Sequence, residues 1–404
     1  MANLDLTVRI NGVNFTGDTL AQARVVRGRE DIYSVAQPAY ASIDLFDKDG
    51  TGFPIEVTQF VEIDIEDSGF QLPLFTGSVS DISVQHVATI DGSRSIWSIT
   101  ATSFLSRMNR RQILFDGAPE ELDGVRAGRI LDAGTGTSFE EFPILAWEDT
   151  GNLRFSTIDF PNLVPVNGGD FLLAALPPSE SGYNAYSLLS DVITSSGGSI
   201  AEFPNGIVVY LSGTTRFDLL QFEGPIELPE NVIQNANFGT LQQSSDIINT
   251  VEVEYADGVV EDQNGTTIAL FGRRASVLRT ILARESDAVE RASNIISNFA
   301  RPRFKLPAIT FATHADPQEL GGLTALFPSV PVDTGPLPPT LGAVSQEYFV
   351  EGIEWELGPG IRNCRLYISD AALSLGAVRW RQAPNDVAWE DVAAILQWQD
   401  ARSL

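Results

Sequence analysis

The chain has 404 residues, of which 43% are hydrophobic, and its 53 acidic and 26 basic residues give a formal net charge of −27. This length corresponds to about three domains of roughly 150 residues, and the apolar content is enough for buried cores, which excludes wholesale disorder. A surface with this negative charge repels the phosphate backbone of nucleic acids, and we therefore do not expect sequence-specific nucleic-acid binding. DNA can still pass such a surface without adhering to it.

The cysteine content and the length of the apolar runs limit which disulfide bonds and membrane segments the chain can form. Cys364 is the single cysteine, so no internal disulfide framework can form, and its place in an alternating stretch next to Leu366 predicts a small buried side chain. The first twelve residues lack the charged and apolar segments of a signal peptide. No apolar run approaches the ~20 residues of a membrane span. We therefore expect no membrane anchor and assembly inside a cell.

Residues 1–112 predict an almost entirely β unit. Short segments with alternating apolar and polar residues, such as AYASIDLFD and QFVEIDIED, are separated by Gly, Asn and Asp clusters. Regularly spaced strands of this kind are typical of a sandwich or barrel. The stretch SFLSRMNRR at 103–111 predicts a short helix that closes the unit.

Residues 113–236 predict an inserted α+β domain. Helices are expected at 125–134 and 183–198, the second with an apolar face and a glycine stop. A hairpin is expected to follow, with its turn at 204–206. The stretch 135–180 is rich in Pro, Gly and acids and predicts long loops.

From residue 237 to 372 the β pattern returns. We expect a strand at 249–257, an amphipathic helix at 286–300, a long Pro- and Gly-rich loop at 316–342, and a strand–turn–strand at 346–370. The last module resembles a looser one at 73–103, which indicates an internal repeat. The predicted fold class is therefore mainly β with α+β insertions.

The tail, 373–404, is rich in tryptophan. Trp380, Trp389 and Trp398 punctuate it, and 387–400 is expected to be helical. Such a tail could fold back on the core or act as a docking arm, and the sequence leaves both interpretations open.

Two strands carry acidic rows. Glu62, Asp64 and Glu66 share one strand face, and Glu252 and Glu254 share another, each opposite apolar residues. Because neighbouring carboxylates repel, such rows lower stability unless water solvates them. One interpretation is a solvated outer sheet face. The other is a negative surface, such as a channel wall that must not bind a polyanion.

Catalytic and metal-binding patterns are weak. The 47–52 loop resembles the start of a calcium loop but lacks its later ligands, so a turn between strands is favoured. His86 and His314 are the only histidines, and neither lies in a catalytic motif. Acidic pairs at 120–121 and 140–141 are unremarkable in so acidic a chain. We expect no metal, no cofactor and no enzymatic activity.

The ordered segments together resemble a known family. ARVVRGREDIYSVAQPAYASIDLFDKDG, VEIDIED, LFTGSVSDISV, then YSLLSDVITSSGGSIAEFPNGIVVYL, DIINTVEVEY and YFVEGIEWELGPGIRNCRLYISD follow the pattern of minor tail, or tail hub, proteins of long-tailed bacteriophages. The resemblance covers about residues 1–372 and contains no invariant catalytic motif.

The resemblance implies two tube-like β-domains, 1–112 and 237–372, on either side of the inserted domain 113–236. It implies a homotrimeric baseplate hub at the virion's tail tip, assembled in the host bacterial cytoplasm. Its partners would be the distal tail or tail tube protein, the tape measure protein and tail fibre or tip proteins. DNA would pass through the ring during ejection without specific binding.

An alternative function is open at this stage. A carbohydrate-binding adhesin or a tail-associated glycosidase would place clustered aromatic side chains beside a carboxylate pair, and the Trp-rich tail offers the aromatic residues.

Overall fold

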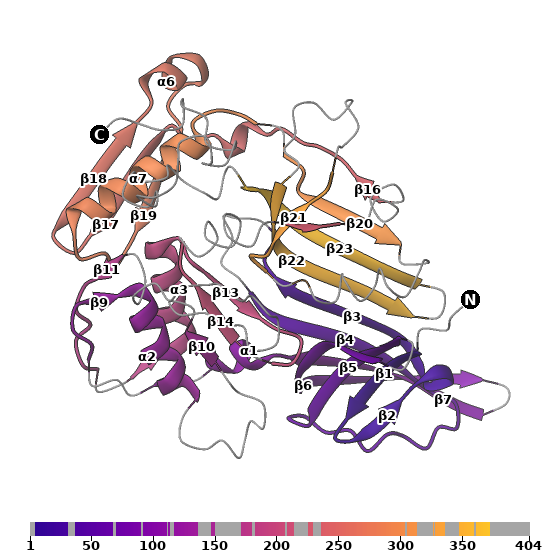
Figure 1. The fold of residues 1–404 in the computed structure, drawn as a ribbon. Coiled ribbons are helices and arrows are strands. Elements are labelled where there is room, and N and C mark those ends of the chain that lie inside the picture. Colours follow the sequence, from indigo (N-terminus) through magenta and orange to yellow (C-terminus); the bar gives the residue numbers. More distant parts are fainter. Residues whose placement is uncertain are drawn as a thin grey trace.

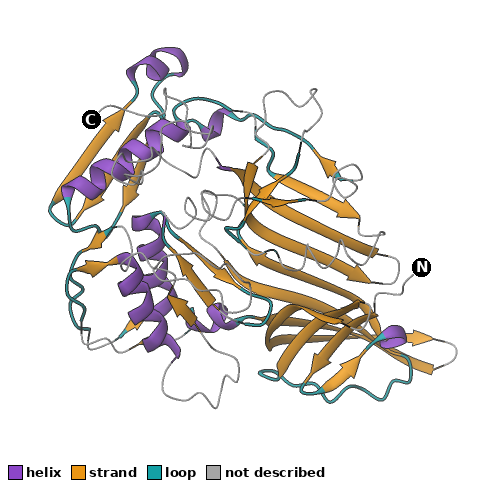
Figure 2. Ribbon diagram, in the orientation of Figure 1, coloured by secondary structure: helices purple, strands orange, loops and turns teal. Residues whose placement is uncertain are grey.

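The computed structural model describes residues 5–30, 37–67, 70–89, 92–110, 112–113, 117–135, 147–149, 171–179, 182–206, 208–213, 225–228, 236–303, 305–312, 326, 328–335, 347–358 and 361–371. Strands dominate this part of the chain, and the α-helices gather on one side of a large sheet (Figure 1, Figure 2). The fold is mainly β with α+β insertions, as the sequence predicts.

The N-terminal half of the large sheet is an antiparallel array. Its elements are β1 (Asp5–Ile10), β2 (Val13–Phe15), the 3-10 turn η1 (Gly17–Thr19), β3 (Leu20–Gly28), β4 (Gln37–Asp47), β5 (Phe60–Asp67), β6 (Phe70–Thr89) and β7 (Gly92–Thr102). In space the strands follow the order β3-β4-β7-β6-β5-β1-β2. The predicted strands between residues 1 and 103 are confirmed.

The C-terminal half adds shorter strands to the same sheet. They are β15 (Ile226–Glu227), β16 (Asn237–Phe238), β20 (Ala308–Ala312), β21 (Pro331–Asp333), β22 (Glu347–Gly358) and β23 (Ile361–Asp370). The order β16-β20-β23-β22 continues directly into β3, so the two halves form one 13-stranded sheet. The predicted strand–turn–strand at 346–370 is the β22–β23 hairpin. Both this hairpin and β6–β7 contain a register shift, between Val350 and Gly352 and between Val79 and Asp81.

The inserted segment forms a lobe of helices and short strands. Its elements are α1 (Phe104–Met108), β8 (Gln112–Ile113), β9 (Glu121–Leu122), α2 (Asp123–Thr135), β10 (Trp147–Asp149), β11 (Leu172–Leu173), β12 (Tyr183–Asn184), α3 (Ala185–Ser196), β13 (Ser199–Glu202) and β14 (Val208–Leu211). Asn184 caps α3 through its side chain, and Gly197 ends the helix with φ 71°. The predicted helices and the β13–β14 hairpin are confirmed.

A second small sheet follows. After the 3-10 turn η5 (Ser244–Asp246) come β17 (Thr250–Tyr255), β18 (Gly258–Gln263), α6 (Gly265–Phe271), β19 (Ala275–Arg279) and α7 (Glu285–Phe299). The sheet has the order β18-β17-β19 and is separate from the large sheet. The sequence predicts α7 almost to the residue, whereas the short helix α6 is not predicted.

Buried apolar residues form two clusters. One joins both halves of the large sheet, from Val8 to Ile368. The other runs from Leu105 to Ala300 and unites α2 and α3 with β17 and α7. The expected boundary at residue 236 therefore does not coincide with the division between the cores, because β17 and α7 bury their apolar faces against the inserted lobe. No helix in the described ranges is long and apolar enough to cross a membrane.

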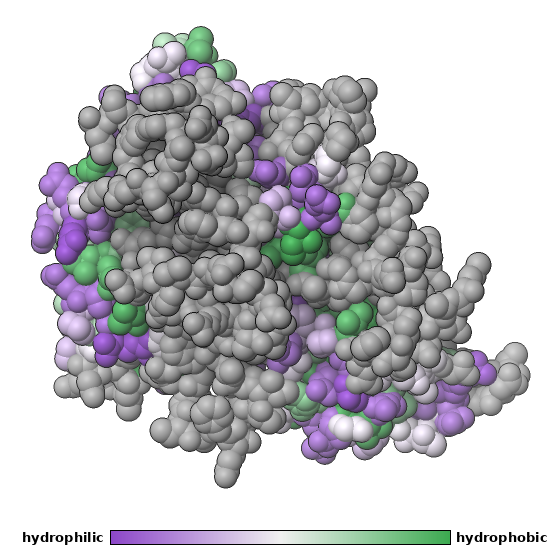
Figure 3. Space-filling model, viewed as in Figure 1, coloured by the Kyte–Doolittle hydropathy of each residue, from purple (hydrophilic) through white to green (hydrophobic). Residues whose placement is uncertain are grey.

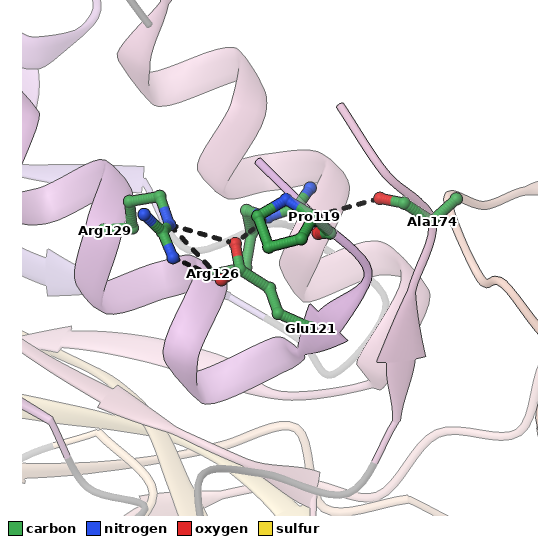
Figure 4. A network of polar contacts seen from close by, with 5 residues as sticks. All are labelled: Pro119, Glu121, Arg126, Arg129 and Ala174. Atoms are coloured by element: carbon green, nitrogen blue, oxygen red, sulfur yellow. Dashed lines mark hydrogen bonds and ion pairs between the residues drawn. The ribbon is translucent and has the colours of Figure 1, made fainter. Parts of the chain in front are cut away.

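A buried polar network fixes α2 to the short strands beside it (Figure 4). Arg126 donates to Glu121 at 2.6 Å and to the carbonyls of Pro119 and Ala174 at 2.9 and 3.0 Å. Arg129 donates to the other oxygen of Glu121 at 2.8 Å. One buried carboxylate thus holds two guanidinium groups of the same helix, which satisfies charges that would otherwise be costly to bury.

Candidate functional site

The two halves of the large sheet meet where β3 pairs with β22, and we call this pairing the seam. It runs antiparallel from Gly352 opposite Gly28 to Leu357 opposite Ala23. The first residues of β22, Glu347 to Phe349, pair with β21. After the register shift between Val350 and Gly352, β22 pairs with β3 instead. Two units that are far apart in sequence therefore share one hydrogen-bonded sheet.

The polar face of the seam carries an ion pair in which one carboxylate has two donors. Arg24 on β3 donates to Glu354 on β22 at 2.6 Å, and the Tyr367 hydroxyl on β23 donates to the other oxygen at 2.8 Å. Burial raises the pKa of Glu354, but the hydrogen bonds from Arg24 and Tyr367 outweigh it and hold the pKa below its ordinary value. Three neighbouring strands are thus linked through one side chain.

A second ion pair lies inside the seam. Arg29 donates to Glu351 at 2.6 Å, and the Ser369 hydroxyl donates to the second carboxylate oxygen. The Arg29 side chain is 8% exposed and that of Glu351 is fully buried. The pair sits where β22 changes its strand partner, so it ties the chain after β3 to both strands of the β22–β23 hairpin.

Glu202 connects the large sheet with the inserted lobe. Its carboxylate accepts hydrogen bonds from the backbone N–H groups of Ala39 and Leu105, at 2.7 and 3.0 Å, and from the Ser103 hydroxyl at 2.6 Å. Burial raises its pKa, although these donors and the nearby charge of Arg27 oppose the change. One carboxylate therefore joins the end of β13, the start of β4 and the first turn of α1.

Arg27 is the most unusual charge at the seam. It is 2% exposed and lies on the apolar face of β3 with Ala23 and Val25. None of its guanidinium nitrogens has a hydrogen-bond partner in the described structure. Burial lowers its pKa to about 10. The negative charge of the Glu202 carboxylate opposes this lowering.

The predicted acidic row on β5 lies on the polar face of the large sheet. Arg9 on β1 forms ion pairs with both Glu62 and Asp64, and Asp64 is only 5% exposed. Glu66 belongs to the same strand and pairs with Gln71 in the ladder. Two carboxylates of this row therefore share the single positive charge of Arg9.

Glu252 and Glu254 lie elsewhere. They are on β17, in the small sheet packed against α7, and not in the large sheet that contains Glu62 and Asp64. The five acids predicted as one surface are therefore divided between two sheets. Trp380, Trp389 and Trp398 lie outside the described residues.

The 47–52 loop forms the expected turn. Asp47 accepts hydrogen bonds from the N–H groups of Gly50 and Gly52, at 2.9 and 2.8 Å, and from the Ser95 hydroxyl at 3.2 Å. Within the described ranges no group of three or more His, Cys, Asp or Glu side chains could hold a metal ion. Cys364 is fully buried, as predicted, and burial raises the pKa of its thiol.

Sequence reasoning missed the polar residues of the seam. A signal for Arg27 exists in ARVVRG, because alternation places this arginine on the same face as Ala23 and Val25. Glu351 and Glu202 carry no comparable signal, since their roles depend on contacts with residues 322 and 97 to 163 positions away.

Comparison with known proteins supports the architecture. No protein-family model matches the sequence, and no curated protein matches it. Among solved structures, the 43 kDa tail protein of prophage MuSo2 from Shewanella oneidensis aligns with a TM-score of 0.60 and 12% identity, over 92% of this chain and 98% of that one. A tail protein from Neisseria meningitidis MC58 aligns with a TM-score of 0.60 and 12% identity, over 93% and 98%.

A third similar structure comes from a secretion machine. It is a component of the Escherichia coli type VI secretion system, itself described as structurally similar to the T4 bacteriophage tail proteins gp27 and gp5. It aligns with a TM-score of 0.50 and 8% identity, over 91% of this chain and 78% of that one. The chain therefore has the fold of phage tail proteins and of related baseplate-hub-like proteins, and the resemblance expected from the sequence is confirmed at the level of fold.

Proposed function

We propose that the chain is a structural subunit of a phage tail, a hub that joins the tail tube to the tail tip. The observation that carries the proposal is the seam. It holds two multistranded units of one chain in a single sheet, with a shared apolar core and two ion pairs across it. A rigid connection between two such units is what a ring-forming hub requires.

We infer from this arrangement that the subunit forms a homotrimer. Three chains that each supply two sheet units would present six similar units in a ring, which fits a sixfold tube above and a threefold tip below. Such a ring needs head-to-tail contacts that close on themselves. The outermost strands of the described sheet, β2 and β16, stand at opposite ends of its order and are suited to that contact.

The polar face of the large sheet is the proposed channel wall. Alternation and register place on this face the carboxylates of Asp44, Glu62, Asp64, Asp81, Glu354 and Glu356 and the guanidinium groups of Arg9, Arg24, Arg94 and Arg365. Carboxylates are in excess, and Arg9 and Arg24 are already paired with them. A polyanion would find few free cations and would slide during ejection.

The remaining assignments follow from the hub. The subunit would sit at the tail tip, contact the distal tail or tube protein, the tape measure protein and the fibre or tip proteins, and act without catalysis. Its mechanism would be the matching of symmetries, with no bond made or broken.

Light scattering on the purified chain tests the proposal. We expect a species of three times the 43.8 kDa chain mass, and a threefold ring in electron micrographs. A chain that stays monomeric at every concentration, alone and with a purified tube protein, would contradict it.

A further inference from the structure

Three arginines of the described residues are at least nine-tenths buried, away from the hydrophilic surface that Figure 3 shows. Two of them have carboxylate partners: Arg126 donates to Glu121, and Arg29 donates to Glu351. Arg27 is 2% exposed, yet none of its three guanidinium nitrogens has an acceptor among the protein atoms of the described structure. Because a buried guanidinium without hydrogen bonds or a counterion is costly, this group requires a partner from outside the chain.

A second buried donor lies on the same face of the sheet. Trp355 is fully buried, and its indole Nε1–H also has no acceptor within the described part of the chain. Arg27 stands opposite Ile353 in the β3–β22 ladder, and Trp355 follows two residues later on β22, opposite Val25. The Arg27 and Trp355 side chains are therefore diagonal neighbours on the apolar face. Such neighbours lie about 7–8 Å apart, which is within reach of side chains as long as these.

The Cys364 thiol helps to locate the guanidinium. Cys364 is the direct cross-strand neighbour of Trp355 on β23. Burial raises the pKa of this thiol, and the charge of Arg27 is close enough to oppose the rise. The guanidinium therefore lies within electrostatic range of β23, on the same side of the sheet as the Trp355 indole. Both unpartnered donors belong to one region of the core beneath the seam.

The carboxylate of Glu202 does not complete this region. Its charge acts on Arg27, but its oxygens accept hydrogen bonds from other groups. Oε2 accepts from the Ala39 N–H and the Ser103 hydroxyl, and Oε1 accepts from the Leu105 N–H. The buried N–H groups of Arg27 are thus left with an excess of donors over acceptors and with a charge that is only partly balanced. A small anion supplies both the acceptor and the charge.

We propose that the apolar face of the seam binds a small monovalent anion, of which chloride is the representative, between the Arg27 guanidinium and the Trp355 indole. The anion would accept hydrogen bonds from both groups and balance the charge of Arg27, which a water molecule cannot do. Phosphate is a poor occupant, because a more highly charged anion costs more to remove from water. The anion would tie β3 to the β22–β23 hairpin on the side opposite the Arg24–Glu354 pair. The inference does not depend on the proposed hub.

Stability in matched salts tests the proposal on the full chain. The thermal unfolding midpoint is measured at constant ionic strength while sodium gluconate is replaced stepwise by sodium chloride, so that screening of the net charge of −27 stays the same. We expect a rise of about 2 °C that saturates as for one site, because a ligand that binds only the folded state stabilises it by mass action. Broadening of the chloride NMR signal by the chain measures the binding itself.

Matched variants locate the anion. Arg27→Met removes the buried charge and should abolish both the chloride dependence of the midpoint and the broadening of the chloride signal. Arg24→Met removes the same charge from the opposite face of β3, where the side chain is 45% exposed, and should keep the full chloride dependence. Trp355→Phe removes the indole N–H and should weaken the Kd for chloride about three- to tenfold, as expected for the loss of one hydrogen bond.

Three results would overturn the proposal. If the parent chain showed neither a chloride-specific rise of the midpoint nor a saturable broadening, Arg27 would have no bound anion, and this result does not require any variant to fold. If Arg27→Met kept the chloride dependence, the anion would bind elsewhere. If Arg24→Met lost as much of the dependence as Arg27→Met, the effect of chloride would follow the net charge and not a defined site.

Discussion

Gly28 and Gly352 face each other across the seam, at the point where β22 leaves β21 and begins to pair with β3. A Cβ atom on Gly352 would lie 2.5 Å from the carbonyl oxygen of Arg29 and 2.8 Å from that of Arg27. Gly28 has φ +84° and a similarly tight surrounding, with Gly352 Cα 2.8 Å from the position of its Cβ. The two backbones therefore approach more closely than any side chain allows.

We predict that Gly352→Ala lowers the free energy of unfolding by about 1–3 kcal/mol, because the added methyl group has only backbone atoms to displace. Denaturant unfolding followed by tryptophan fluorescence measures it. Gly239→Ala is the matched control: a Cβ there meets nothing within 4 Å, so its effect should stay within about 0.5 kcal/mol. If both variants had the same free energy of unfolding, β3 and β22 could move apart at the seam without loss of stability, and the prediction would be wrong.

The buried ion pair beside these glycines gives a second prediction. Glu351→Ala leaves the Arg29 guanidinium buried without its carboxylate, and we expect a loss of about 3–5 kcal/mol in the free energy of unfolding. Arg24→Ala removes the partner of Glu354 in a pair whose Arg24 side chain is 45% exposed, so it should cost less than about 1 kcal/mol. Chemical denaturation of both variants tests the difference, and a similar loss in each would contradict the distinction between buried and exposed pairs.

The sequence predicts the local elements well because short-range patterns set them. The period of two in ASIDLFD, and the apolar stripe with a following proline at 286–300, correspond to β4 and α7. Helix α6 escapes prediction because GTTIALF is a single two-turn segment capped by Asn264, too short to show periodicity.

Long-range relationships could not be predicted in the same way. The sequence gives no register between β3 and β22, which lie more than 300 residues apart, so the seam and the Arg29–Glu351 pair remain hidden. It also cannot distinguish two acidic strands of equal pattern. VEIDIED and TVEVEY look alike, yet Glu62 and Asp64 share an ion pair with Arg9 in one sheet, while Glu252 has no ion pair among the described residues of another.

The Glu202 carboxyl predicts a pH dependence of stability. Burial raises its folded pKa above the unfolded value of 4.5, so the folded state holds the proton more tightly. As the pH rises from 4.5 through the folded pKa, the free energy of unfolding should fall, by about 1.4 kcal/mol for each pKa unit of difference. Glu202→Gln keeps an acceptor oxygen and cannot ionise, so it should abolish this decline.

Measuring both proteins across that pH range tests it. The difference in the free energy of unfolding between Glu202→Gln and the parent chain should shift in favour of the variant as the pH rises, because all other acids cancel in the comparison. A constant difference would show that the Glu202 carboxyl has the same pKa in the folded and unfolded states, with its three donors compensating its burial.

The proposed channel wall predicts where a new positive charge would make DNA adhere. Glu62→Lys adds a cation to the polar face of the large sheet and removes one of the two carboxylates that pair with Arg9. Glu252→Lys makes the same change in charge on the small sheet, away from the proposed channel. On the assembled ring we expect linear DNA to be retained by the first variant at about 50 mM salt and released near about 200 mM, as phosphate contacts are. The second variant should retain no more DNA than the parent chain.

Filter binding or electrophoretic mobility measures the retention, and the contrast is informative because both variants have the same net charge. Equal retention by the two would mean that the polar face of the large sheet does not line the path of DNA.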